Sequence, residues 1–206
     1  MEKLVKLFCG LFLASSLLIS CDKDEDDDVS QKNYLKIGET EYVLSKGTYE
    51  NYGQMEDGDW QYDGYNLDLT LFSSGFTIST DSEGDMDVSG SGQVIYFEMF
   101  SSKGNEFDSR DYTFSSSEPY PVGTFDYGDF WISYSDDNED NNWIEISSGK
   151  VTISKSGDTY SITIDCKSEN GDNIKGFFKG TLQYFDYTVE TKSTSMTPSK
   201  LSKRKK

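Results

Sequence analysis

The chain has 206 residues and a formal net charge of −18, with 14 Tyr, 13 Phe and 18 Gly against only 3 Pro. It contains no His, which excludes Ser-His-Asp and Cys-His catalysis, histidine acid–base chemistry and His-ligated metals. The acidic balance repels phosphate backbones, so nucleic acid is not an expected partner. Aromatic-rich segments between glycine turns, without a long 3.6-residue period after the N-terminus, predict an all-β protein.

Residues 1–20 have the layout of a secretory signal peptide. Lys3 and Lys6 precede an apolar run at 7–19, which is too short for a comfortable transmembrane helix. The run ends in LISC at 18–21, which resembles the lipobox of bacterial lipoproteins. That resemblance implies cleavage before Cys21 and acylation of its thiol with palmitate-type chains, which would anchor the protein to a membrane. The alternative is an ordinary signal peptide with an incidental cysteine.

An acidic run, DKDEDDD at 22–28, follows this cysteine. Lys23, Asp24 and Glu25 give it a resemblance to the export signal of surface lipoproteins in Bacteroidetes-type bacteria. The resemblance implies a lipid-anchored protein of the outer membrane that faces the cell exterior. A run of like charges also repels itself and stays extended, so residues 21–32 are expected to form a lipidated acidic tether.

One all-β domain is predicted over residues 33–188. We expect a hairpin of 34–38 and 40–44 that continues through 48–52, followed by strands at 65–72, 76–80, 94–100, 111–114 and 125–134. Residues 81–92, DSEGDMDVSGSG, are expected to form an acidic glycine-serine loop, and 118–123 a turn. Residues 192–206 carry six Lys or Arg and no acid, so 189–206 is expected to be a disordered basic tail.

Three further strands are predicted between 143 and 187, separated by turns at 156–158 and 170–172. In the middle strand Ile162, Ile164 and Cys166 share one face, because side chains alternate with a period of two. Thr163 and Asp165 are expected on the opposite, solvated face. Cys166 is therefore expected to be a buried, inert thiol. The last strand is expected to run from 174 to 184.

This spacing gives about nine strands and favours an antiparallel β-sandwich, with a closed, lipocalin-like barrel as the alternative. The motifs IGETEY at 37–42 and IKGFFKGTL at 174–182 resemble those of small lipid-anchored all-β proteins of gut Bacteroidetes, many of them uncharacterised. The resemblance implies a fold class and a cellular setting, and it implies no activity.

Acidic residues alternate in the predicted loop 81–92, at Asp81, Glu83, Asp85 and Asp87. Carboxylate oxygens suit Ca²⁺, but the pattern lacks the closing Glu of the twelve-residue calcium loop. No cofactor is therefore expected, and Ca²⁺ in this loop is the alternative hypothesis.

Aromatic residues suggest a second kind of site, a platform for sugar rings. Its candidate members are Trp60, Tyr62, Tyr65, Trp131 and Trp143. Flat apolar faces beside carboxylates suit carbohydrate binding, and a structural role in the core is the alternative. Only Trp60, which lies in a polar loop, is predicted to be exposed.

These features together predict a non-catalytic surface protein that acts as a binding or accessory module for a glycan or protein ligand. A lipocalin-like carrier of a small apolar ligand is one alternative. A hydrolase that uses two carboxylates is another, although no spacing in the sequence singles out a pair.

Overall fold

The computed structural model describes residues 32–54, 61–82, 84–135 and 142–188 of the chain. Cys21, Lys23, Asp24, Glu25 and the basic tail lie outside these residues. The described residues form eleven strands: β1 (Tyr34–Ile37), β2 (Thr40–Gly53), β3 (Tyr65–Ser73), β4 (Phe76–Thr80), β5 (Met86–Ser101), β6 (Arg110–Phe114), β7 (Thr124–Ser135), β8 (Trp143–Ser156), β9 (Thr159–Ser168), β10 (Asn173–Gly180) and β11 (Gln183–Asp186). Among them we find no helix with the length and apolar character needed to cross a membrane.

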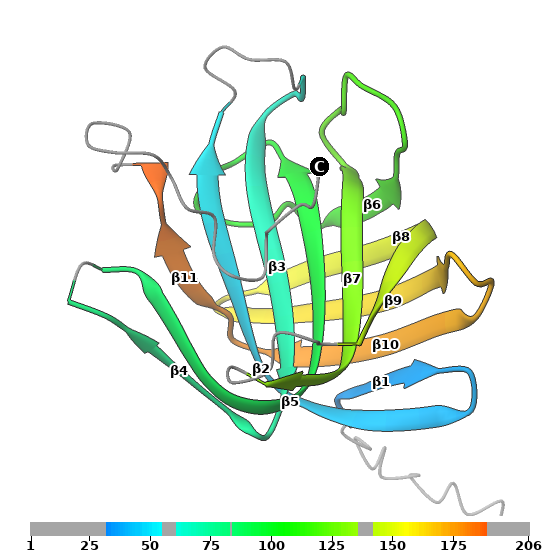
Figure 1. The fold of residues 1–206 in the computed structure, drawn as a ribbon. Coiled ribbons are helices and arrows are strands. Elements are labelled where there is room, and N and C mark those ends of the chain that lie inside the picture. Colours follow the sequence, from blue (N-terminus) through cyan, green and yellow to red (C-terminus); the bar gives the residue numbers. More distant parts are fainter. Residues whose placement is uncertain (1–31, 55–60, 83, 136–141, 189–206) are drawn as a thin grey trace, which may run out of the picture. The chain divides into compact units, whose positions relative to one another are not determined.

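The sheet closes on itself into a barrel, because β1 pairs with β10 on one side and with β2 on the other (Figure 1). Hydrogen bonds run from β1 through β10, β9, β8, β6, β7, β5 and β3 to β2, which makes a ring of nine strands. The predicted all-β fold, sandwich or barrel, is confirmed, and the barrel is the form that it takes. Closure leaves the ring without an unpaired edge.

Two strands lie outside this ring. β4 pairs only with the first half of β5, and together they form a hairpin arm outside the ring of nine strands (Figure 1). Phe76 of the arm packs against Phe72 on the outer face of β3. β11 pairs with β2 in parallel, and β6 likewise lies parallel to β7. The other pairings are antiparallel, as predicted.

The prediction of a loop over residues 81–92 is wrong for most of its length. β5 begins at Met86, so only residues 81–85 remain for the turn between β4 and β5. The glycines permit the bend of this long strand. Gly90 has a φ of 116°, and a Cβ atom there would lie 2.2 Å from the carbonyl oxygen of Gly75. The glycine-serine composition therefore marks a close backbone approach within an arm of paired strands.

The predicted single strand from 174 to 184 is divided in the structure. β10 ends at Gly180, and the chain resumes as β11 beside β2. Leu182, between the two strands, packs against the interior cluster. Its Cδ2 atom would lie only 2.4 Å from a Cβ atom placed on Gly47, so the glycine makes room for this crossing.

The three-strand prediction at the C-terminal end is confirmed by β8, β9 and β10, which pair in sequence. Ile164 is 1 % exposed and faces the interior, whereas its neighbour Thr163 is exposed. Cys166 is buried and free, and burial raises the pKa of its thiol to about 12. The predicted burial of Cys166 is therefore confirmed.

Large aliphatic and aromatic side chains occupy the barrel interior. Every ring strand from β1 to β10 contributes to one cluster of buried residues, among them Leu69, Phe97, Phe130 and Ile162. The strand predicted at 65–72 is confirmed by β3, whose Leu67, Leu69 and Leu71 all belong to this cluster. Because packed side chains line the interior, the described residues give no support to the hypothesis of a carrier with a ligand inside the barrel.

Candidate functional site

The outer faces of β2, β3, β5 and β7 carry polar side chains that are buried. Along β3, Leu67, Leu69 and Leu71 face the interior, so Asn66, Asp68 and Thr70 face outward. All three outward residues are nevertheless buried, with Asp68 only 2 % exposed. An outward-facing carboxylate without solvent contact is rare unless it is paired, so this face is the strongest candidate site of the described residues.

Three acidic residues from neighbouring strands lie side by side on this face. Glu50 of β2 is the register partner of Asp68 on β3, and Asp68 is the register partner of Glu98 on β5. Directly opposed residues have Cβ atoms about 5 Å apart. We call Glu50, Asp68 and Glu98 the outer carboxylate row. Glu50 is fully buried and Glu98 is partly exposed.

Each carboxyl group of the row accepts a hydrogen bond from a neighbour on the same face. The Tyr52 hydroxyl donates to Glu50 Oε2 at 2.8 Å, and the Tyr96 hydroxyl donates to Asp68 Oδ2 at 2.5 Å. The Asn66 amide donates to Glu98 Oε1 at 2.9 Å. These donors fix the orientation of the carboxyl groups, and they are neutral, so they do not balance the charge.

Several oxygens of this face are buried without a hydrogen-bond partner. They are Glu50 Oε1, Asp68 Oδ1, Asn66 Oδ1, Asp129 Oδ1 and the hydroxyls of Thr48 and Thr70. A buried polar group left unsatisfied costs about 1–3 kcal/mol. Each such group requires a partner, and the cluster of them on one face makes this face the candidate site.

The acidity of these groups is shifted in one direction. Burial raises the pKa of Glu50 to about 7. Burial, and after it the charges of Glu98 and Glu50, raise the pKa of Asp68 well above its ordinary value. Asp129 on β7, whose carboxyl accepts a hydrogen bond from Tyr127, has a pKa raised by burial to about 7. The face thus holds protons that an exposed acidic face would release.

Aromatic rings border the row. Tyr187, just after β11, stacks on Tyr52 with ring centroids 5.2 Å apart, and its hydroxyl accepts a hydrogen bond from the Met86 amide. Toward the arm, the same face becomes an apolar cluster that includes Phe72, Phe76 and Trp131. The row is therefore an acidic patch bordered by aromatic rings, and Asp129 adds a further carboxyl group on the same face.

The aromatic residues predicted to form a platform do not gather on one exposed face. Trp131 is 7 % exposed and packs in the apolar cluster under the arm. Tyr65 packs against the interior cluster, and Tyr62 stacks on Phe100 with centroids 5.0 Å apart. Trp143 is 49 % exposed. Trp60 lies outside the described residues, so its part in the prediction is untested.

The acidic turn between β4 and β5 is organised by its own backbone. The Asp85 amide donates to Asp81 Oδ1 at 2.9 Å, and the Ser79 hydroxyl donates to Asp87 at 3.3 Å. Among the described residues no group of three Asp, Glu or Cys side chains has an arrangement that could hold a metal ion. Glu83 lies outside those residues, so the Ca²⁺ hypothesis stays a prediction.

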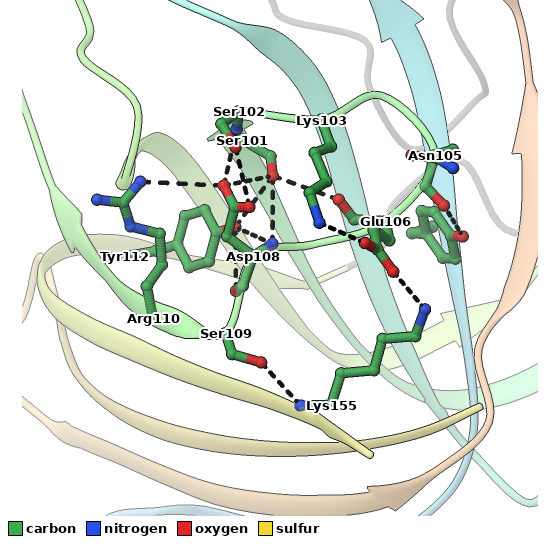
Figure 2. A network of polar contacts seen from close by, with 11 residues as sticks. Ser101, Ser102, Lys103, Asn105, Glu106, Asp108, Ser109, Arg110, Tyr112 and Lys155 are labelled. Atoms are coloured by element: carbon green, nitrogen blue, oxygen red, sulfur yellow. Dashed lines mark hydrogen bonds and ion pairs between the residues drawn. The ribbon is translucent and has the colours of Figure 1, made fainter. Parts of the chain in front are cut away.

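A second polar network, over residues 101–112, closes one end of the barrel (Figure 2). Phe107, which is 1 % exposed, places its ring 5.5 Å from that of Tyr49 and 5.9 Å from that of Tyr112. Glu106 accepts hydrogen bonds from Lys103 at 2.6 Å and Lys155 at 2.5 Å, and these bonds lower its pKa to about 2.

The loop is further held by Asp108, which accepts hydrogen bonds from the amide and the hydroxyl of Ser102, both at 2.9 Å. The Tyr49 hydroxyl donates to the Asn105 carbonyl at 2.7 Å. Charged groups here have partners of opposite sign, in contrast to Glu50 and Asp68. The polar groups of this network are therefore satisfied by contacts within the chain, and the network is not a candidate ligand site.

Sequence reasoning missed the outer carboxylate row. The sequence does contain a sign of this site, a single acidic residue inside each of two apolar strands: Asp68 in NLDLTL and Glu98 in YFEMF. Alternation with Leu67 and Leu69 indicates that Asp68 faces outward, but it does not indicate that Asp68 is buried. What brings the two acidic residues together is the strand register, which depends on pairings between segments far apart in the sequence.

Comparisons with protein-family models, curated proteins and solved structures find no match to this chain. The function is therefore argued from the side chains of the structure and from the sequence motifs.

Proposed function

We propose that this chain is a lipid-anchored protein of the outer membrane that faces the cell exterior and acts as a non-catalytic binding module. The LISC motif ending at Cys21 and the run containing Lys23, Asp24 and Glu25 support the anchoring and the display. The ligand is a glycan or a protein. Both supply the hydrogen-bond donors that a site rich in acceptors requires.

The observation that carries the binding role is the set of buried, unpartnered oxygens around Glu50 and Asp68. A protein fold alone gains nothing from them, because apolar side chains of similar size would be at least as stable there. Their concentration on one outer face, beneath the arm and the Tyr52–Tyr187 stack, supports recognition of a second molecule.

Binding is tested on intact cells that export the full chain. Labelled glycans and labelled extracts of surface proteins are added, and retained label is compared with cells lacking the chain. Thr48→Val with Thr70→Val removes two unpartnered hydroxyls at almost constant volume and should lower retention. Ser154→Val on the exposed part of β8 is the matched control. Equal retention by cells with and without the chain would refute the binding role.

Anchoring is tested separately with Cys21→Ala. Metabolic labelling with a palmitate analogue should mark the parent and leave the variant unlabelled, because the acylated residue is absent. Neutral replacements across residues 22–28 should keep the label and abolish protease shaving of the domain on intact cells. Label on the Cys21→Ala protein would contradict the lipobox interpretation.

A carboxylate-based hydrolase is the second candidate, and the outer carboxylate row is the observation in its favour. Hydrolysis of glycosides uses two neighbouring carboxyl groups, one of which keeps its proton near neutral pH. Glu50, with a pKa raised to about 7, has that property beside Asp68. Release of nitrophenol from aryl glycosides, lost in Glu50→Gln, would favour this candidate over the binding module.

A further inference from the structure

We propose that the outer carboxylate row binds the cationic head of a lysine or arginine side chain. This deepens the proposed function, on which it rests, by selecting a protein ligand over a glycan.

Every unpartnered atom at the site is an oxygen that can accept a hydrogen bond. Glu50 Oε1, Asp68 Oδ1 and Asn66 Oδ1 lie with the Thr48 and Thr70 hydroxyls on one face of two paired strands. The one amide nitrogen among these side chains, that of Asn66, already donates to Glu98. Ammonium and guanidinium groups are donors only, so they satisfy such a site without adding an unmatched acceptor. A sugar hydroxyl brings an acceptor with each donor.

Charge leads to the same ligand. Between described residues, ion pairs involve Glu39, Glu106, Asp108, Asp111 and Asp165. None of these pairs includes Glu50 or Asp68. A buried carboxylate keeps its charge only beside an opposite charge, and otherwise it retains a proton. A cation at the row would replace that proton and complete the site.

The surroundings suit an organic cation better than a bare ion. The stacked rings of Tyr52 and Tyr187 and the buried ring of Tyr96 border the row. Aromatic faces attract ammonium and guanidinium groups, and they pack against the methylene stem that carries them. No described set of three carboxylates has the arrangement of a metal site.

Two sources can supply this group, a separate protein or the chain's own basic segment at 192–206, which follows Tyr187 by a few residues and carries six Lys or Arg. The ligand chemistry is the same in both cases. The experiment therefore includes a chain that ends at Thr191, which removes the internal source.

The test measures binding of a short labelled lysine peptide to the purified full chain in detergent, by fluorescence anisotropy. The same peptide with acetylated lysines keeps the stem and loses the charge. We expect the acetylated peptide to bind at least about tenfold more weakly, because one charge-assisted hydrogen bond is worth about that factor. Glu50→Gln and Asp68→Asn should each weaken the charged peptide by a similar factor. Asp165→Asn, on the exposed face of β9, should not.

The truncated chain identifies the source. Tighter peptide binding after truncation assigns the site to the internal segment, and unchanged binding assigns it to another protein. Equal binding of charged and acetylated peptides, or equal loss in Asp165→Asn and Asp68→Asn, would overturn the proposal. Undiminished peptide binding by Thr48→Val with Thr70→Val would overturn it as well. If cells that export the parent chain still retain a labelled glycan in that case, the proposed binding module stands and only the proposal of a cationic ligand is refuted.

Discussion

Two halves of the barrel have similar interiors and different exteriors. β8, β9 and β10 expose their outer polar residues, such as Thr163, Asp165 and Lys175, and pair Asp165 with Lys175 across strands. The second half of β2 and the facing part of β3 bury outer polar residues such as Thr48 and Thr70. Glu50 and Asp68 there have no ion pair among the described residues.

The difference shows that alternation and solvation are separate properties of a strand. Both halves alternate with a period of two, because each presents an apolar face to the same interior. Whether the other face meets water depends on what packs over it. In the second half the arm and the Tyr52–Tyr187 stack lie on that face. A polar residue placed there loses water and must find a partner elsewhere.

The largest expected effect is that of Ile164→Asp on β9. Ile164 is 1 % exposed among apolar side chains, so the variant buries a charge without a partner, which costs several kcal/mol. Native stabilities are about 5–15 kcal/mol, so the domain should unfold or melt far lower. Thr163→Asp, one residue earlier and exposed, should cost under about 1 kcal/mol. Equal melting temperatures would contradict the register of β9.

The next largest effect compares the two exteriors directly. Thr70→Asp on β3 and Thr163→Asp on β9 make the same change at outward positions, but Thr70 is fully buried beside Asp68. We expect Thr70→Asp to cost roughly 3 kcal/mol in urea unfolding, since it buries one more acid among acids. Thr70→Val, the matched control, should be neutral or stabilising. Similar costs for the two aspartates would mean that the outer face of β3 is solvated.

The sequence predicts the fold further than it predicts the site, for a physical reason. Most strand positions, the hairpin at 34–44 and the burial of Ile164 and Cys166 follow from local patterns, and the structure confirms them. The choice between sandwich and barrel depends on the pairing of β1 with both β2 and β10. The carboxylate row depends on the register of three strands. Neither property is local, so no single segment carries it.

A pH dependence sharpens the comparison at Glu50. Its pKa rises from 4.5 in the unfolded chain to about 7 in the fold. Between these values the folded state keeps a proton that the unfolded state has lost, so stability falls as pH rises. The shift corresponds to roughly 3 kcal/mol. Urea unfolding at pH 4.5 and pH 8 should show Glu50→Gln gaining about that much relative to the parent at the higher pH.

The control for this profile is Glu39→Gln in the turn between β1 and β2, where the carboxylate side chain is 98 % exposed. A Glu50→Gln profile parallel to that of the parent would show that Glu50 is ionised in the fold, which would place a cation or water beside it.

The smallest effect is expected on the exterior that water reaches. Asp165 and Lys175 pair across β9 and β10 with side chains 61 % and 46 % exposed. Solvent screens such a pair, and holding two flexible side chains together costs entropy, so exposed pairs contribute about 0.2–1 kcal/mol. Asp165→Asn should therefore lower the free energy of unfolding by about 0.5 kcal/mol, and 1 M salt should abolish the difference. A loss as large as that of Thr70→Asp would show that the outer face of β8, β9 and β10 is covered in solution. The two halves of the barrel would then have similar exteriors as well as similar interiors.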